Sequence, residues 1–262
     1  MRFVQIETVD HVASPVIAIG NHYPAGHRIA PHQHRRGQLI SGASGLIVLA
    51  TPAGTWVVPP QRGVWIPPAT EHHVRMVGAV DMQSLYVEPN AVPGMPRHCQ
   101  VVGISSFMRS LITEALDLPL EHEPGSRAGA IMGLIQQEMP RLPALPLSLQ
   151  YPTHGPLAER CRRFVERPSI HETINDWSAD LGMSRRAFTR LFRRETGLSF
   201  QAWRQQACLL CAMPRLAAGE AVTTVAIDLG YENPAAFTLM FKRAFGTPPL
   251  TYLGLRRART AA

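Results

Sequence analysis

One pattern occurs twice near the C-terminal end of the sequence: DLGMSRRAFTRLFRR at residues 180–194 and DLGYENPAAFTLMFKR at residues 228–243. The Asp-Leu-Gly triplets begin at positions 180 and 228, and the Phe-Thr pairs begin at 188 and 237, so the second copy has one additional turn residue. Apolar residues spaced by three and four flank a glycine-centred turn in each copy, which predicts a short helix, a turn and a second helix. The sequence therefore predicts two helix-turn-helix units.

Positive charge is concentrated in the same part of the chain. Residues 151–262 contain 15 Arg, one Lys and nine acidic residues, whereas residues 1–150 contain ten Arg and ten acidic residues, so the second part carries the whole formal charge of +7. A basic segment beside a neutral one is expected where the basic segment binds a polyanion such as DNA. The hydrophobic content of 45% excludes disorder, and 262 residues suffice for two domains.

The pattern from residue 157 onward is almost entirely helical. It predicts a helix that contains Leu157 and Phe164, another around Trp177, a third capped by Ser184, and a long helix from about residue 199 to 218 that joins the two units. Pro214 lies inside the long helix and predicts a kink or an early end, because proline removes a backbone donor and crowds the preceding turn.

The helix after Ser184 has one apolar face and one face rich in arginine. The second face consists of Arg185, Arg186, Thr189, Arg190, Arg193 and Arg194. A guanidinium group can donate two hydrogen bonds to a guanine edge or bind a phosphate. We interpret Arg186, Thr189 and Arg190 as base contacts, and Arg193 and Arg194 as lying nearer the DNA backbone. The alternative is a solvated face of an ordinary helical bundle.

The second unit differs from the first at the corresponding positions. It has Ala235, Thr238, Leu239, Lys242 and Arg243 there. Small apolar side chains can contact a thymine methyl group but cannot distinguish donor and acceptor patterns. We therefore predict that the first unit supplies most base selection and that the second mainly binds and positions the backbone.

Residues from about 157 to 252 resemble the DNA-binding domain of the AraC/XylS family of bacterial transcription regulators. The strings that carry the resemblance are VAIDLGY at 225–231, FTLMFKRAFG at 237–246 and PPLTY at 248–252. The resemblance implies a sequence-specific regulator of double-stranded promoter DNA that forms a homodimer. It also implies that the two recognition helices enter successive major grooves about 34 Å apart.

The N-terminal part has a different pattern. Short runs of Val, Ile and Trp between residues 28 and 88, broken by Pro and Gly, predict a small antiparallel β-domain. Two amphipathic helices follow, and five prolines between residues 140 and 156 predict an extended connector. We predict a β-barrel at 1–100, a helical segment at 101–140, a linker at 141–156 and the double helix-turn-helix domain at 157–262.

Residues 26–45 resemble the first cupin motif, with His32, His34 and then Gln38 where a glutamate is usual. A looser second motif contains Ala69 and His72. The resemblance implies that the N-terminal half is a cupin-like β-barrel, as in many AraC-like regulators. The fold class is thus a cupin-like barrel with two following helices, then an all-helical domain.

Three interpretations of the histidines remain open. His32, His34 and His72 could bind a divalent metal, they could line a metal-free pocket for a small effector, or they could be structural. The predicted effector-binding set is His32, His34, Gln38, Trp56, Trp65, His72 and Tyr86. Gln38 is a weaker ligand than a carboxylate, which favours a regulator without catalytic activity over the alternative of a metal-dependent cupin enzyme fused to a DNA-binding module. A third alternative is an architectural DNA-binding protein.

The remaining features concern assembly and location. An apolar stripe at 107–116 predicts a dimer contact, with packing against the chain's own barrel as the alternative.

Four cysteines, Cys99, Cys161, Cys208 and Cys211, are too few for a disulfide framework, and we expect buried thiols. Residues 1–10 lack a secretory pattern and no apolar run is long enough to span a bilayer, so we expect a cytoplasmic protein associated with the nucleoid when bound to DNA.

Overall fold

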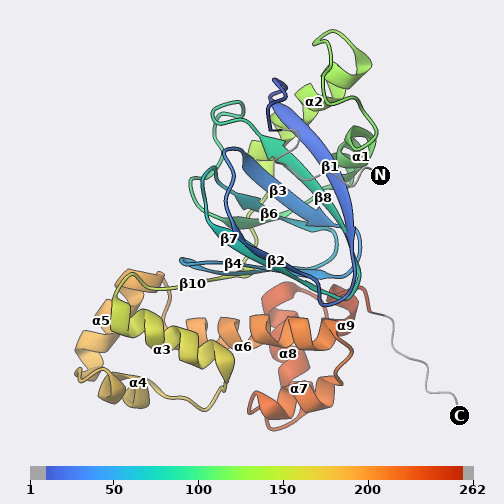
Figure 1. Ribbon diagram of the computed structural model, residues 1–262. Helices are drawn as coiled ribbons and strands as arrows, with labels where there is room; N and C mark the ends of the chain where they lie inside the picture. Colours follow the sequence, from blue (N-terminus) through green and yellow to red (C-terminus); the bar gives the residue numbers. More distant parts are fainter. Residues whose placement is uncertain (1–9, 256–262) are drawn as a thin grey trace, which may run out of the picture. The chain divides into compact units, whose positions relative to one another are not determined.

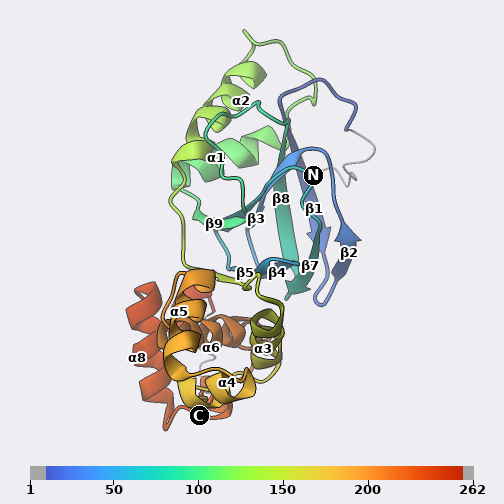
Figure 2. The same ribbon diagram turned by 90° about the vertical axis from the view of Figure 1, so that its left-hand side faces the viewer.

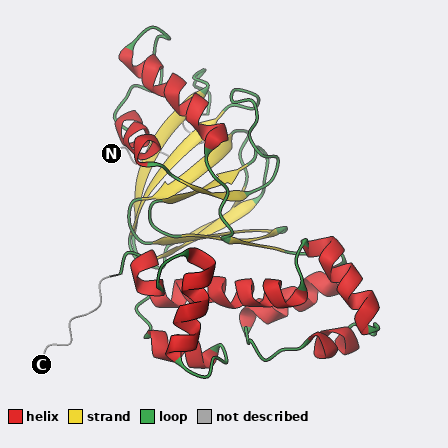
Figure 3. Cartoon of the chain, turned by 180° about the vertical axis from the view of Figure 1, so that it is seen from behind, coloured by secondary structure: helices red, strands yellow, loops and turns green. Residues whose placement is uncertain are grey.

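The computed structural model describes residues 10–255. These residues form two compact units, one of residues 10–51 and 56–148 and another of residues 52–55 and 149–255. Strands dominate the first unit and helices make up the second, as the colours of Figure 3 show. The predicted fold class, a β-rich domain followed by a helical domain, is confirmed. The ends of the predicted domains at 1–9 and 256–262 lie outside the described residues.

Two five-stranded sheets make up the β-rich part (Figure 1), in the strand orders β1-β8-β3-β6-β9 and β10-β5-β4-β7-β2. Neighbours such as β1 and β8, or β4 and β7, run antiparallel. The strands are β1 (Val16–Tyr23), β2 (Arg28–His32), β3 (Gly37–Gly42), β4 (Leu46–Thr51), β5 (Gly54–Val58), β6 (Arg62–Ile66), β7 (His72–Val77), β8 (Val80–Val87), β9 (Gln100–Gly103) and β10 (Ser148–Gln150).

Two helices cover the outer face of the first sheet. Helices α1 (Ser106–Ala115) and α2 (Arg127–Glu138) lie side by side over it in Figure 2, and the short 3-10 turn η2 (Met139–Arg141) follows α2. Successive residues of a strand point to opposite faces, so Leu39 and Leu85 face these helices while Gln38 faces the interior between the sheets. Leu39 and Leu85 share a buried cluster with Met108 and Ile112 of α1.

Most of the apolar stripe on α1 packs within its own domain. Met108, Leu111, Ile112 and Ala115 are buried there. Phe107, in contrast, is 50% exposed. The intramolecular alternative therefore accounts for most of the stripe, and the dimer contact stays a prediction.

The helical unit contains two groups of helices joined by a long one. The helices are α3 (Gly155–Glu166), α4 (Ile174–Asp180), α5 (Arg185–Thr196), α6 (Phe200–Ala217), α7 (Val222–Asp228), α8 (Pro234–Phe245) and α9 (Pro249–Tyr252). Figure 1 shows α3, α4 and α5 around one end of α6 and α7, α8 and α9 around the other. Of the kink or early end predicted at Pro214, the early end is wrong, because α6 continues to Ala217; the kink stays a prediction. Among the described residues, every helix is too short or too polar to span a lipid bilayer.

Each group of helices is built on aromatic side chains. The first has Phe164, Trp177, Phe188, Phe192, Phe200 and Trp203 in edge-to-face or tilted contacts. The second has Tyr231, Phe237, Phe241, Phe245 and Tyr252. Such pairs stabilise a core beyond the burial of their area, so each helix-turn-helix unit has its own rigid centre.

Candidate functional site

The two helix-turn-helix units share the same local construction. Gly182 and Gly230 adopt positive φ angles of 62° and 87° in the turns, a conformation that favours glycine. The side chains of Ser184 and Asn233 accept backbone hydrogen bonds at the starts of α5 and α8. The turn spans 181–184 in the first unit and 229–233 in the second, so the additional residue predicted from the spacing is present.

Helix α5 presents a row of arginine side chains, four of which have no partner in the described part of the chain. Phe188, Leu191 and Phe192 are buried beneath it. The exposed residues on the opposite side are Arg185, Arg186, Thr189, Arg190, Arg193 and Arg194. Arg194 donates to Glu195 at 3.2 Å, whereas the other four arginines make no hydrogen bond or ion pair there. These four guanidinium groups therefore retain all their donors for an external acceptor.

Other arginines of the same unit have structural roles. Arg160 forms ion pairs with Glu172 and Asp180, and its guanidinium lies 4.4 Å from the centre of the Trp177 ring. Arg215 of α6 forms ion pairs with Glu220 and Asp228. Helix α5 thus differs from α3 and α6 in presenting four unpaired arginines together on one exposed face.

Helix α8 has a weaker basic surface. Ala235, Leu239, Lys242 and Arg243 are exposed, and Thr238 is half-buried. Leu239 is 50% exposed. The apolar residues lie toward the start of the helix and the two basic residues lie in its last turn, so α8 can donate charged hydrogen bonds at one end only.

Three histidines meet inside the β-rich unit. His32 and His72 are paired across β2 and β7, and the ligand nitrogens of His32, His34 and His72 all lie within 4.8 Å of one another. His72 is buried and the other two are half-buried. His73, the next residue, is exposed on the opposite face, as the alternation of a strand requires.

Backbone carbonyl groups fix the orientation of all three imidazole rings. The Nδ1 atoms of His32, His34 and His72 lie 2.9, 2.6 and 2.8 Å from the carbonyl oxygens of Ala30, Arg36 and Thr70. A carbonyl oxygen can only accept, so each Nδ1 carries the proton and donates it. With Nδ1 as the donor, Nε2 is the nitrogen left to coordinate a metal, which is the arrangement that backbone carbonyls impose on metal-binding histidines.

Gln38 lies beside the cluster. Its side-chain amide is 3.0 Å from Nε2 of His34 and 3.0 Å from the hydroxyl of Ser84. The amide oxygen of Gln38 faces Nε2 of His34, and its amide nitrogen donates to the hydroxyl of Ser84. Gln38 thus holds a ligand in place and is not itself a strong ligand.

The three histidines fit a divalent cation of the zinc type. Burial lowers the pKa of His72 to about 4, so this ring is neutral at physiological pH, the form that binds metal. Its Nε2 atom is buried and has no hydrogen-bond partner among the described residues. An orphaned acceptor of this kind is costly unless something donates to it or coordinates through it. Three histidine nitrogens are the protein ligand set of zinc sites that also bind an exogenous ligand.

The predicted aromatic residues of the effector pocket are not all near the histidines. The Tyr86 ring packs edge-on to His34, with centroids 5.2 Å apart. Trp65 pairs with Leu39 and joins the cluster under α1 and α2, so it lies on the opposite face of the sheet. Trp56 is buried and donates to the carbonyl of Cys99 at 3.1 Å.

One residue that no motif identified lies on α1. Arg109 on α1 lines a cavity, and its only signal in the sequence is a basic residue inside an apolar stripe.

The four cysteines are free thiols. Cys99, Cys161 and Cys208 are buried, as expected, whereas Cys211 is half-buried. Burial raises the pKa of Cys208 to about 12, which opposes thiolate formation.

Comparisons with known proteins give matches over both parts of the chain. A model described as the AraC-like ligand binding domain matches residues 14–138, and one described as a helix-turn-helix domain matches residues 177–254. The HTH-type transcriptional regulator NimR of Escherichia coli is 34% identical over 222 residues, which are 85% of this chain and 81% of NimR.

Solved structures of regulators also match. ToxT from Vibrio cholerae is 9% identical over 94% of this chain and 100% of its own, with a TM-score of 0.39. The DNA-binding domain of AdpA, solved with a target DNA, is 32% identical over 40% of this chain and 96% of its own, with a TM-score of 0.35.

Proposed function

This chain belongs to the AraC family of transcription regulators, and we propose that it controls transcription by placing α5 in the major groove of a promoter. Four unpaired arginines on one exposed face of α5 are the observation that carries this proposal. Arg186, Thr189 and Arg190 contact base edges, while Arg193 and Arg194 lie toward phosphates. Helix α8 enters the next groove and binds mainly through Lys242 and Arg243.

The β-rich domain supplies the signal. We place the effector site at the histidine cluster, with Gln38 and Tyr86 beside it. His32, His34 and His72 would hold a divalent cation there, and the cation would supply a Lewis-acidic position for an oxygen or nitrogen atom of the effector. Binding regulates transcription only if the effector has different affinities for two arrangements of the protein.

Catalysis by this cluster is the second candidate function. The set of three histidines favours catalysis, because catalytic zinc sites use such a set, and the neutral Gln38 in place of a carboxylate opposes it. Stoichiometric metal together with turnover of a substrate would support an enzyme, whereas metal without turnover supports a sensor.

The protein acts as a cytoplasmic homodimer in this proposal. Phe107 and Leu134, which are 50% and 39% exposed on α1 and α2, are the apolar side chains left for the contact between copies. A dimer doubles the number of grooves that are contacted and so raises sequence specificity.

Selection of bound duplexes from a random pool tests the proposed function. The full chain should enrich one sequence with two elements about one helical turn apart. An architectural DNA-binding protein would enrich no sequence. Repeating the selection with zinc and with candidate small molecules tests the sensor, because an effector should change the enrichment.

A further inference from the structure

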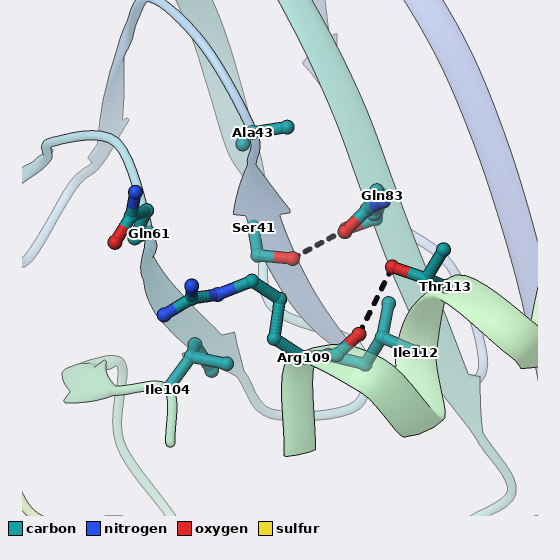
Figure 4. A pocket seen from close by; sticks show the side chains of 9 residues that line it. Ser41, Ala43, Gln61, Gln83, Ile104, Arg109, Ile112 and Thr113 are labelled. Atoms are coloured by element: carbon teal, nitrogen blue, oxygen red, sulfur yellow. Dashed lines mark hydrogen bonds between the residues drawn. The ribbon is translucent and has the colours of Figure 1, made fainter. Parts of the chain in front are cut away.

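A small cavity lies in the β-rich unit, away from the histidines. Its volume is about 70 Å³, and Figure 4 shows it between helix α1 and the strands β3, β6 and β8. The residues that line it are Ser41, Gly42, Ala43, Gln61, Gln83, Ile104, Arg109, Ile112 and Thr113. No carboxylate is among these lining residues.

Arg109 brings a positive charge into this cavity. Figure 4 shows its side chain extending from α1 along the cavity, with the guanidinium between Gln61 and Ile104. The Nε atom is buried and has no hydrogen-bond partner, and within the described residues the side chain has no ion pair. A partly buried guanidinium without an acceptor is unfavourable, so an anion that supplied acceptors would relieve this cost.

Two side-chain amides border the same space, Gln83 on β8 and Gln61 in the turn before β6. The side chains of Gln61 and Gln83 are without hydrogen-bond partners in the described part of the chain, so their amide nitrogens can donate. The Ser41 hydroxyl donates to the Gln83 carbonyl at 3.3 Å, which leaves its lone pairs but no proton for a ligand. Donors exceed acceptors among the groups that remain, as an anion requires.

Gln61 occupies a backbone position that favours glycine. Its φ angle is 62°, and the turn is closed by a hydrogen bond of 3.2 Å from the Arg62 amide to the Pro59 carbonyl. In a turn with proline at the second position and positive φ at the third, glycine is the least strained residue. A glutamine held there has a cost to stability, and such costs are concentrated at binding sites.

We propose that this cavity binds a short aliphatic monocarboxylate. A guanidinium matches the two oxygens of a carboxylate in a bidentate arrangement. A cavity of roughly 150 Å³ accommodates benzene, so this one accepts a carboxylate with about one or two further carbons. Ile104, Ile112 and Ala43 form walls for those carbons.

The ligand would act on helix α1. It connects Arg109 of α1 with glutamines of the sheet, and Phe107 of the proposed dimer contact lies on the same helix. This regulatory role rests on the proposed function, although the binding itself does not. A carboxylate would therefore change the position or stability of α1, and through it the dimer.

Calorimetric titration of the full chain with propionate, at constant ionic strength in chloride, tests the proposal. The wild type should bind propionate saturably, and Arg109→Met should weaken binding roughly tenfold to a hundredfold. Arg141→Met is the matched control, because Arg141 is an exposed arginine of the same domain that pairs with Glu138. It should leave the affinity unchanged.

Gln61→Gly distinguishes a loss of propionate binding from a loss of folding stability. It should weaken propionate binding while the melting temperature stays equal or rises, since glycine relieves the positive φ angle. Equal affinities of wild type and Arg109→Met would overturn the proposal, and so would Arg109-dependent binding of inorganic phosphate in place of propionate. If the chain failed to select DNA but bound propionate through Arg109, the regulator proposal would fail and this site would stand.

Discussion

Asp180 and Asp228 are equivalent residues of the two helix-turn-helix units, and each pairs with an arginine from an earlier helix. Arg160 donates to Asp180 at 2.9 Å, and Arg215 donates to Asp228 at 2.5 Å. The repeated Asp-Leu-Gly pattern thus preserves the junction between the first helix and the turn. The exposed faces of α5 and α8 are not repeated in the same way, so the two units share a scaffold but differ in their contact surface.

This difference predicts unequal effects of substitutions on α5 and α8. Arg190→Ala should cost about 1–3 kcal/mol of binding to the selected sequence and relax the choice of base at one position. Lys242→Ala should weaken binding to all sequences alike and reduce the salt slope by about one. Titrations of the selected duplex and of its single-base variants at several salt concentrations measure both effects. Equal losses of specificity in the two variants would contradict the assignment.

The histidine cluster predicts stoichiometric binding of zinc. Protein dialysed against a zinc buffer should retain one ion per chain, since three Nε2 atoms are oriented for it. His32→Gln and His72→Gln should each lose the ion. His73→Gln, on the opposite face of β7, is the matched control and should retain it. Metal analysis after dialysis measures the zinc that each protein retains. Zinc retained by His72→Gln would show that the proposed site is wrong.

Glu195 predicts a pH dependence of stability in the helical unit. Its carboxylate accepts hydrogen bonds from the Thr153 hydroxyl and from the backbone amides of Thr153 and His154. These bonds and Arg194 lower its pKa from 4.5 to about 2. The charged carboxylate stabilises the folded state. Its contribution to the free energy of unfolding is therefore present above about pH 4.5 and is lost as the pH falls toward 2.

Glu195→Gln should therefore lower the melting temperature by a few degrees at neutral pH. The difference from the wild type should shrink as the pH falls below about 4.5. Glu159→Gln is the control, because Glu159 is exposed and has a single long ion pair with Arg162. A difference that stayed constant from neutral to acid pH would show that Glu195 acts through contacts other than its charge.

The exposed Phe107 predicts the effect of a charge on assembly. Phe107→Asp should shift the full chain from dimer to monomer in sedimentation velocity, because a carboxylate would be desolvated in the apolar contact. The variant should keep its melting temperature, since Phe107 is half exposed and lies outside the buried stripe of α1. A dimer that survived the substitution would place the contact elsewhere.

The helical unit could be predicted from the sequence in detail because its signals are local. Helix periodicity, the cap at Ser184 and the turn glycines each depend on residues a few positions apart. Local signals gave two expectations for the long helix, an end near residue 218 and an early end at Pro214. Only the first agrees with α6, because the choice between them depends on packing around the helix. Proline weakens a helix locally, and tertiary contacts can outweigh that cost.

The barrel was predictable in type but not in the position of every side chain. The spacing of His32, His34 and His72 predicted that they would meet, and they do. Trp65 was assigned to the same pocket, but its face depends on the register of β6 against β3, which pairs it with Leu39. Register is a non-local property, so neither the position of Trp65 nor the cavity at Arg109 could be derived from motifs.

The central claim is that the arginines of α5 select a DNA sequence. The most direct measurement is a fluorescence-anisotropy titration of the full chain with the selected duplex and with a shuffled duplex, for the wild type and for the double variant Arg186→Ala and Arg190→Ala. We predict that the wild type binds the selected duplex at least about a thousandfold more tightly, and that the double variant loses this preference. Equal affinity of the wild type for both duplexes, or no complex at low salt, would contradict the account.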